Sequence, residues 1–162
     1  MLVVFGGLPG TGKTTISRTL ATRLSATYLR VDESEQALRS AGRLADGVGP
    51  AGYIIGNALA ASNLAIGQTV IVDCVNPVPE SRQGWRATAN RAKATILETE
   101  VVCSDPVEHR RRIEQRISDI DGLALPNWQA VLDRDYSPWD EPHVVIDTAR
   151  LTPDEAVERI AR

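Results

Sequence analysis

The chain has 162 residues, of which 43% are apolar and 24% charged, and these values indicate an ordinary globular domain and exclude a disordered chain. The net charge of −3 argues against a general nucleic-acid binder. Two cysteines without a C-x-x-C pair argue against a disulfide framework or zinc cluster and fit a reducing cytosol, and the first residues carry no export signal. We therefore expect one cytoplasmic domain covering residues 1–162.

Apolar runs predict five strands, at residues 2–5, 26–31, 69–73, 95–103 and 143–147. Helical spacing and capping residues predict helices at 13–24, 33–40, 51–66, 80–93, 105–116 and 128–132, and a terminal helix after a capping box at 152–155. Strands that alternate with helices predict an α/β fold, a parallel sheet covered on both faces. Ligands bind at the carboxyl ends of such strands, so the residues just after positions 5, 31, 72, 103 and 146 should meet at one site.

The stretch 47–72, which overlaps the end of a Gly-rich loop at 41–50, contains no charged residue. A membrane span needs about 20 predominantly apolar residues, and this stretch is too polar and too interrupted to be one. We expect a buried helix followed by a central strand, and no membrane partner.

Residues 7–14 match the Walker A phosphate-loop pattern G-x-x-x-x-G-K-[ST] at every position, between a predicted strand and a predicted helix. The glycines let successive backbone N–H groups point at phosphate oxygens, and the helix adds the positive end of its dipole. Lys13 is expected to reach the β- and γ-phosphates of ATP, and the Thr14 hydroxyl to bind Mg²⁺. The alternative is an ordinary Gly-rich turn. The predicted ATP-binding residues of this segment are Gly7, Leu8, Pro9, Gly10, Thr11, Gly12, Lys13, Thr14 and Thr15.

Two aspartates end predicted strands, Asp32 the second and Asp73 the third. The fold should bring both carboxylates near Thr14 and Mg²⁺. A phosphoryl acceptor needs a group that orients its hydroxyl and takes its proton, and Asp32 would supply both. Asp73 follows an apolar strand, the usual place of a magnesium-holding aspartate. Either residue could instead cap a turn or helix, and the sequence leaves open which one is the base and which one holds the metal.

Arg112 and Arg116 lie four residues apart on one face of the predicted helix 105–116. Beside the phosphates they would neutralise charge on the transferred group or stack on adenine. The following loop, with Gly122 and Pro126, suits a mobile lid at about 111–127. The alternative is a solvated, salt-bridged helix, which we expect for Arg110 and Arg111.

Other residues near the predicted site are harder to assign. Thr148, after the last strand, is expected near the base or the phosphates of ATP, with a plain turn as the alternative. His109 is expected at the surface, and the aromatic residues Trp128, Tyr136 and Trp139 in packing.

The sequence resembles small P-loop kinases, the group of polynucleotide kinase, chloramphenicol phosphotransferase and gluconate or shikimate kinases, and above all their bacterial branch labelled AAA-type ATP-binding proteins. The resemblance is carried by residues 7–14, 70–77 and 103–106 and by the tail 128–148. It implies the strand order 2-3-1-4-5, an acceptor site between the Asp32 region and the Gly-rich loop, and a lid over ATP. Polynucleotide kinases carry an arginine shortly after the strand-two aspartate. Glu35 stands at about that place here, which argues against an oligonucleotide acceptor.

The sequence is compatible with three candidate functions. The first is a kinase that uses ATP and Mg²⁺ to phosphorylate a hydroxyl of a small molecule, with Lys13, Asp32, Arg112 and Arg116 as catalytic residues. The second is a 5′-hydroxyl polynucleotide kinase, and the third is an ATP-binding switch or slow ATPase. The two strand-end aspartates favour a kinase, because a switch needs no acceptor base. The acceptor, the preference for ATP over GTP, and the choice between monomer and homodimer stay open.

Overall fold

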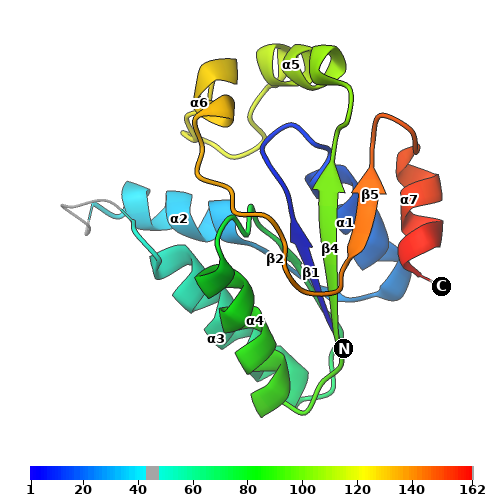
Figure 1. Ribbon diagram of the computed structural model, residues 1–162. Helices are drawn as coiled ribbons and strands as arrows, with labels where there is room; N and C mark the ends of the chain where they lie inside the picture. Colours follow the sequence, from blue (N-terminus) through cyan, green and yellow to red (C-terminus); the bar gives the residue numbers. More distant parts are fainter. Residues whose placement is uncertain (43–47, 162) are drawn as a thin grey trace.

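The computed structural model describes residues 1–42 and 48–161 and contains a five-stranded parallel sheet with helices on both faces (Figure 1). The strands are β1 (Leu2–Gly6), β2 (Thr27–Arg30), β3 (Val70–Asp73), β4 (Ile96–Val102) and β5 (Val144–Asp147). Their order is β2-β3-β1-β4-β5, and each neighbouring pair is parallel. The fold class and the strand order expected from the sequence are confirmed.

The helices are α1 (Lys13–Leu24), α2 (Val31–Ser40), α3 (Ala51–Ala65), α4 (Pro79–Arg91), α5 (Pro106–Gln115), α6 (Trp128–Leu132) and α7 (Pro153–Ile160). Helices α1 and α7 cover one face of the sheet, and α3 and α4 cover the other (Figure 1). Helices α5 and α6 lie beyond the carboxyl ends of the strands, at the edge where the sequence predicts the site (Figure 1). The predicted capping box is present at α7, where Thr152 and Glu155 cap each other's backbone.

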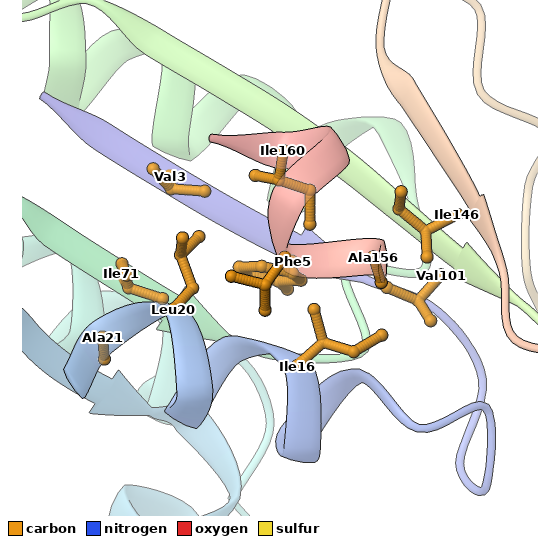
Figure 2. Packing of buried hydrophobic residues seen from close by; sticks show 11 residues of the cluster. Val3, Phe5, Ile16, Leu20, Ala21, Ile71, Val101, Ile146, Ala156 and Ile160 are labelled. Atoms are coloured by element: carbon orange, nitrogen blue, oxygen red, sulfur yellow. The ribbon is translucent and has the colours of Figure 1, made fainter. Parts of the chain in front are cut away.

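Alternate side chains of β1 enter two separate cores. Val3 and Phe5 pack with residues of α1 and α7 in the cluster that Figure 2 shows. Leu2 and Val4 point to the opposite face and pack with α3 and α4, where Trp85 is fully buried. A parallel strand covered on both faces must be apolar throughout, which is why residues 2–5 form a continuous apolar run.

The second strand and helix begin and end at different residues from those predicted. Strand β2 ends at Arg30 and α2 begins at Val31, with no loop between them. Asp32 and Glu33 occupy the first turn of α2, where carboxylates interact favourably with the positive end of the helix dipole. Asp32 is therefore a helical residue, and its prediction as the end of a strand is wrong.

Helix α3 is less buried than its uncharged sequence predicts. Gly52, Gly56, Ala60 and Leu64 form its buried stripe, whereas Ile54 is 64% exposed. The helix belongs to the outer layer of the domain, so only one side of it meets the core. None of the described helices is long and apolar enough to cross a membrane. Residues 43–47 of the predicted Gly-rich loop lie outside the described residues.

Candidate functional site

The phosphate loop joins β1 to α1 in a backbone shape that requires glycine. Gly7 has a φ of +140°, and a Cβ atom there would lie 2.2 Å from the carbonyl oxygen of Val101. Gly12, with a φ of +93°, is the N-cap of α1, so the positive end of the helix dipole opens onto the loop. Thr11 Oγ1 donates a hydrogen bond to the Leu8 carbonyl at 2.9 Å and fixes the curl of the loop. The local structure thus matches what the motif needs in order to bind phosphate.

Lys13 lies at the centre of the site and is only 6% exposed. Its Nζ donates to the Leu8 carbonyl at 3.4 Å. Burial lowers the pKa of Lys13, the carboxylates of Asp73 and Asp32 oppose this, and the positive charge of Arg116 lowers the pKa further. Both predicted carboxylates and one predicted arginine are therefore close enough to Lys13 to act on its charge.

His109 supports the phosphate loop from α5, and its predicted surface position is wrong. The side chain is buried, and its Nε2 donates to the Pro9 carbonyl at 2.8 Å. Its ring meets Trp128 edge-on, with ring centroids 5.2 Å apart. Four residues later, Ile113 packs so closely on the loop that a Cβ at Gly10 would lie 2.6 Å from its Cδ1. The four-residue spacing of His109 and Ile113 was the available sequence signal for a buried face of α5.

A cleft of 620 Å³ opens above the phosphate loop. It is lined by Gly10, Gly12, Lys13, Thr14, Thr15, Arg18, Thr19, Arg30, Arg111, Arg112, Gln115, Arg116 and Asp119. Six of these side chains are cationic and one is a carboxylate, so the cleft favours a polyanion such as a nucleotide triphosphate.

Arg112 is fixed by hydrogen bonds and is not a free surface charge. Its Nε donates to Glu108 at 2.8 Å, and its Nη1 and Nη2 donate to the Thr148 hydroxyl and carbonyl oxygens at 2.8 and 3.1 Å. The Thr148 hydroxyl in turn donates to the Thr11 carbonyl at 2.7 Å. These bonds join α5, the turn after β5 and the phosphate loop. A neighbouring cavity of 520 Å³, lined by Gly12, Thr15, Arg112 and residues 148–153, adjoins this contact.

The remaining arginines of α5 differ in their surroundings. Arg110 and Arg111 are exposed and paired with Glu114 and Glu108, as predicted for a solvated helix face. Arg111 nevertheless lines the cleft. Arg116, at the C-cap of α5, lines both the cleft and the acidic cavity described below, and makes no ion pair with a described residue.

Asp73 lies at the end of β3 beside a buried arginine, Arg30, which no local sequence signal identifies. Asp73 is 2% exposed, Tyr28 donates to its Oδ2 at 2.9 Å, and Arg30 Nε lies 3.8 Å from the same oxygen. Arg30 Nη1 also donates to Asp119 at 2.9 Å, and Arg18 reaches Asp119 at 2.8 Å. The hydrogen bond from Arg30 lowers the pKa of Asp119 to about 2. The sheet register pairs Arg30 with Asp73, but that pairing follows from the strand order and not from either local sequence.

Asp32 faces a different space from the one expected at a strand end. It lines a cavity of 460 Å³, whose other polar residues include Glu35 on the same face of α2. Asp32 has no hydrogen bond or ion pair with a described residue, whereas Glu35 pairs with Arg39 at 3.4 Å. Burial raises the pKa of Glu35, and the charge of Asp32 adds to this. We call this space the acidic cavity after its two carboxylates, although its lining also carries the cationic side chains of Lys13, Arg39, Arg116 and Arg134. Lys13 and Arg116 line the cleft as well.

Different parts of the predicted lid, residues 111–127, line the cleft and the acidic cavity. Arg112 and Arg116 line the cleft above the phosphate loop, as expected, and Arg111 lines it as well. The segment 122–126 lines the acidic cavity instead of covering the nucleotide side. Gly122 packs against α2, where a Cβ would lie 2.9 Å from Gln36 Nε2.

The oxygen atoms near Lys13 fit a magnesium ion that keeps most of its ligands as water and phosphate. The described residues contain no group of three His, Cys, Asp or Glu side chains that could enclose a metal. Asp73 Oδ1 and both carboxylate oxygens of Asp32 accept no hydrogen bond from a described residue, and the Thr14 hydroxyl lines the cleft. This set of hard oxygen atoms is suited to Mg²⁺ held together with a nucleotide.

Solved structures share this fold over nearly the whole chain. The chain is 18% identical to the Mycobacterium tuberculosis APS kinase CysC, solved with AMPPNP and APS, with a TM-score of 0.72 and coverage of 99% of this chain and 94% of that one. It is 20% identical to a gluconokinase from Sinorhizobium meliloti 1021, with a TM-score of 0.65 and coverage of 99% and 91%. Chaetomium thermophilum Kti12, solved with ADP-AlF3, is 21% identical, with a TM-score of 0.64 and coverage of 99% and 97%.

No curated protein matches the chain. The family model described as AAA domain matches residues 2–133, which include the phosphate loop, β1 to β4 and α5. The protein therefore belongs to the AAA domain family, and its fold is that of the small P-loop kinases.

Proposed function

We propose that the protein is a kinase that uses ATP and Mg²⁺ to phosphorylate a hydroxyl group of a small molecule. One observation carries the proposal: the cationic cleft and the cavity that holds the Asp32 carboxylate share Lys13 and Arg116. The first space suits a triphosphate and the second suits a hydroxyl group, so a phosphoryl group can pass between them at these two cations. The location in the cytoplasm stays a prediction.

The nucleotide would lie along the phosphate loop. The loop N–H groups and Lys13 would hold the β- and γ-phosphates, with Thr14 and Thr15 at the start of α1. Gly12, Thr15 and Arg112 line both the cleft and the 520 Å³ cavity, which has room for the adenine and ribose. Arg112 would lie between base and phosphates, where its guanidinium faces both.

The acceptor would enter the acidic cavity. Its 460 Å³ is in the range of small-molecule sites, and the segment 122–126 closes it on one side, which leaves little room for a polynucleotide chain. The unpaired carboxylate of Asp32 would accept a hydrogen bond from the attacking hydroxyl. Apolar residues such as Val31, Tyr53 and Leu123 line the same space and would exclude water from it.

Thr14 and Asp73 would hold a magnesium ion, which would supply positive charge that offsets part of the negative charge of the phosphates. Thr14 lines the cleft, and Asp73 is buried at the end of β3. With Asp73 on the metal, the carboxylate of Asp32 would serve the acceptor. Arg30 and Tyr28 keep the Asp73 carboxylate oriented.

The transfer would then follow from positioning. The hydroxyl oxygen attacks the γ-phosphorus in line with the bond to the β–γ bridging oxygen, its proton passes to Asp32, and that bond breaks to leave ADP. Lys13 and Arg116 neutralise the charge on the transferred group, because both face the two spaces. The names of two structural neighbours, a gluconokinase and an APS kinase, support this class of reaction.

The direct test is transfer of label from γ-labelled ATP with Mg²⁺ to pools of small hydroxyl compounds and to 5′-hydroxyl oligonucleotides. Label in a small-molecule pool that is lost in Lys13→Ala and in Asp32→Asn supports the proposal. Label on oligonucleotides alone would indicate that the protein is a polynucleotide kinase. Release of free phosphate at a rate that Asp32→Asn leaves unchanged would favour a nucleotide switch.

A further inference from the structure

A groove of 1060 Å³ runs between α3 and α4, on the far side of these helices from the sheet. Helix α3 carries no charged residue, and Ile54 at the groove is 64% exposed. An uncharged helix in the outer layer of a domain is unusual, because such helices present charged residues to water on their outer side. The groove therefore has the character of a surface that something covers.

Both helices line the groove at the spacing of helix–helix contacts. On α3 the lining residues include Ile54, Ala58, Ala61 and Ala65, with Tyr53 and Asn57 beside them, and on α4 they include Glu80, Gly84, Ala87 and Arg91, with Ser81 beside them. The first four residues named on each helix are separated by four, three and four positions, the pattern of a helix face that packs against another helix. The small side chains at the centre of both sets would let the backbone of a further helix approach closely.

The charges at the two ends of α4 show which helix fits. Glu80 and Arg91 are exposed at opposite ends, about 16 Å apart along the axis, and neither makes an ion pair with a described residue. If a second α4 lies antiparallel, Glu80 meets Arg91 of the partner subunit, and Gly84 meets Ala87 of the partner subunit. The 4-3-4 spacing reads the same in both directions along the helix, so both pairings form at once in a single antiparallel register. The face is therefore complementary to itself.

We propose that this groove is the interface of a two-fold symmetric homodimer, in which α4 of each copy lies antiparallel in the groove of the other. A two-fold interface pairs a surface with itself, which is the property that this face has. A membrane surface would select a cationic rim, and the groove offers one arginine and one glutamate. The dimer would bury the exposed Ile54 and both unpaired charges of α4.

The dimer would also reach the acidic cavity. Tyr53 and Pro77 line both the groove and that cavity. The Tyr53 hydroxyl accepts a hydrogen bond from the Asn76 backbone N–H at 2.9 Å, which ties α3 to the turn after β3. A copy seated in the groove would hold this wall of the cavity in place.

Sedimentation velocity over a wide range of concentrations tests the interface. We expect the wild-type protein to reach twice the chain mass, and Ala87→Glu, at the centre of the face, to raise the dissociation constant at least 100-fold. Asn90→Glu is the matched control: it adds the same charge to an exposed position of α4 outside the groove, and should leave the dimer intact. A wild-type protein that stays at the chain mass throughout, or a dimer that Ala87→Glu leaves unchanged, would overturn the proposal.

A charge exchange tests the antiparallel register. Glu80→Arg and Arg91→Glu should each weaken the dimer at least tenfold, because each places like charges opposite one another. The double variant restores opposite charges across the two-fold axis and should return the dissociation constant to within about threefold of wild type. A change in helix stability would not produce this recovery of the dissociation constant, because both substitutions interact unfavourably with the helix dipole and their costs add. A double variant weaker than either single one would refute the proposed register.

Discussion

Replacing Arg30 by methionine should lower the free energy of unfolding by about 1–3 kcal/mol, because the change removes the guanidinium beside the buried carboxylate of Asp73 and leaves Lys13 as its remaining nearby cation in the described part of the chain. The Arg30 side chain is 1% exposed and Asp73 is 2% exposed, so water cannot take the place of the guanidinium. Methionine keeps most of the apolar stem, which separates the loss of charge from the loss of packing. The Tyr28 hydroxyl would remain as the one hydrogen-bond donor to Asp73 among the described residues.

The hydrogen bond to Asp119 should account for little of this cost, although it is the shorter contact. Asp119 is 40% exposed and can be solvated, so Asp119→Asn should cost less than about 1 kcal/mol. Adding Asp73→Asn to Arg30→Met removes the stranded charge and should recover part of the lost stability. Urea unfolding of the wild type, the single variants and the double variant measures each value. A cost below about 1 kcal/mol for Arg30→Met, or no recovery in the double variant, would refute the role of Arg30 as the partner of Asp73.

Three further predictions follow from the site. Gly7→Ala should abolish binding of a non-hydrolysable ATP analogue by calorimetry, because its Cβ would collide with the Val101 carbonyl oxygen; unchanged affinity would contradict the loop geometry. His109→Phe keeps the ring but leaves the Pro9 carbonyl without its donor, so thermal unfolding should show a loss of about 1 kcal/mol and calorimetry should show weaker nucleotide binding; an unchanged variant would refute the support role. The hydrogen bond from Arg30 lowers the pKa of Asp119 to about 2. The ionised Asp119 carboxylate therefore stabilises the folded state fully above the unfolded pKa near 3.8, and this stabilisation is lost as the pH falls through 2. Urea midpoints of wild type and Asp119→Asn should therefore differ near pH 6 and converge near pH 2, and a constant difference would contradict the shift.

Much of the fold was predictable because its signals are local. The phosphate loop is a contiguous pattern, and its consequence, a helix that starts at Lys13, depends on the residues beside it. The apolar run of β1 reports burial on both faces directly. The order of the strands in the sheet, in contrast, was predicted from the resemblance to a family. Hydrophobic periodicity locates strands in the sequence but does not show which strands are neighbours.

The site was harder to predict where contacts join distant segments. Arg30 meets Asp73 only because β2 pairs with β3, and its bond to Asp119 joins positions far apart in the chain. Asp32 acts on the charge of Lys13, but its backbone was wrongly placed, because the end of an apolar run does not show whether a loop precedes the next helix. The segment 122–126 was recognised as a loop, whereas the space that it lines depends on how α5 packs.

The most direct test of the account is to measure nucleotide affinity and phosphoryl transfer in the same Asp32→Asn preparation. The structure places Asp32 in the acidic cavity and outside the cleft of the phosphate loop, so the affinity for a non-hydrolysable ATP analogue with Mg²⁺ should stay within about threefold of wild type. Transfer to the small-molecule acceptor should fall by a factor of about 10² to 10⁴, the usual contribution of a general base. Lys13→Ala should lose both. Transfer that survives in Asp32→Asn, or nucleotide binding that disappears in it, would contradict the separation of the two spaces and with it the proposed kinase mechanism.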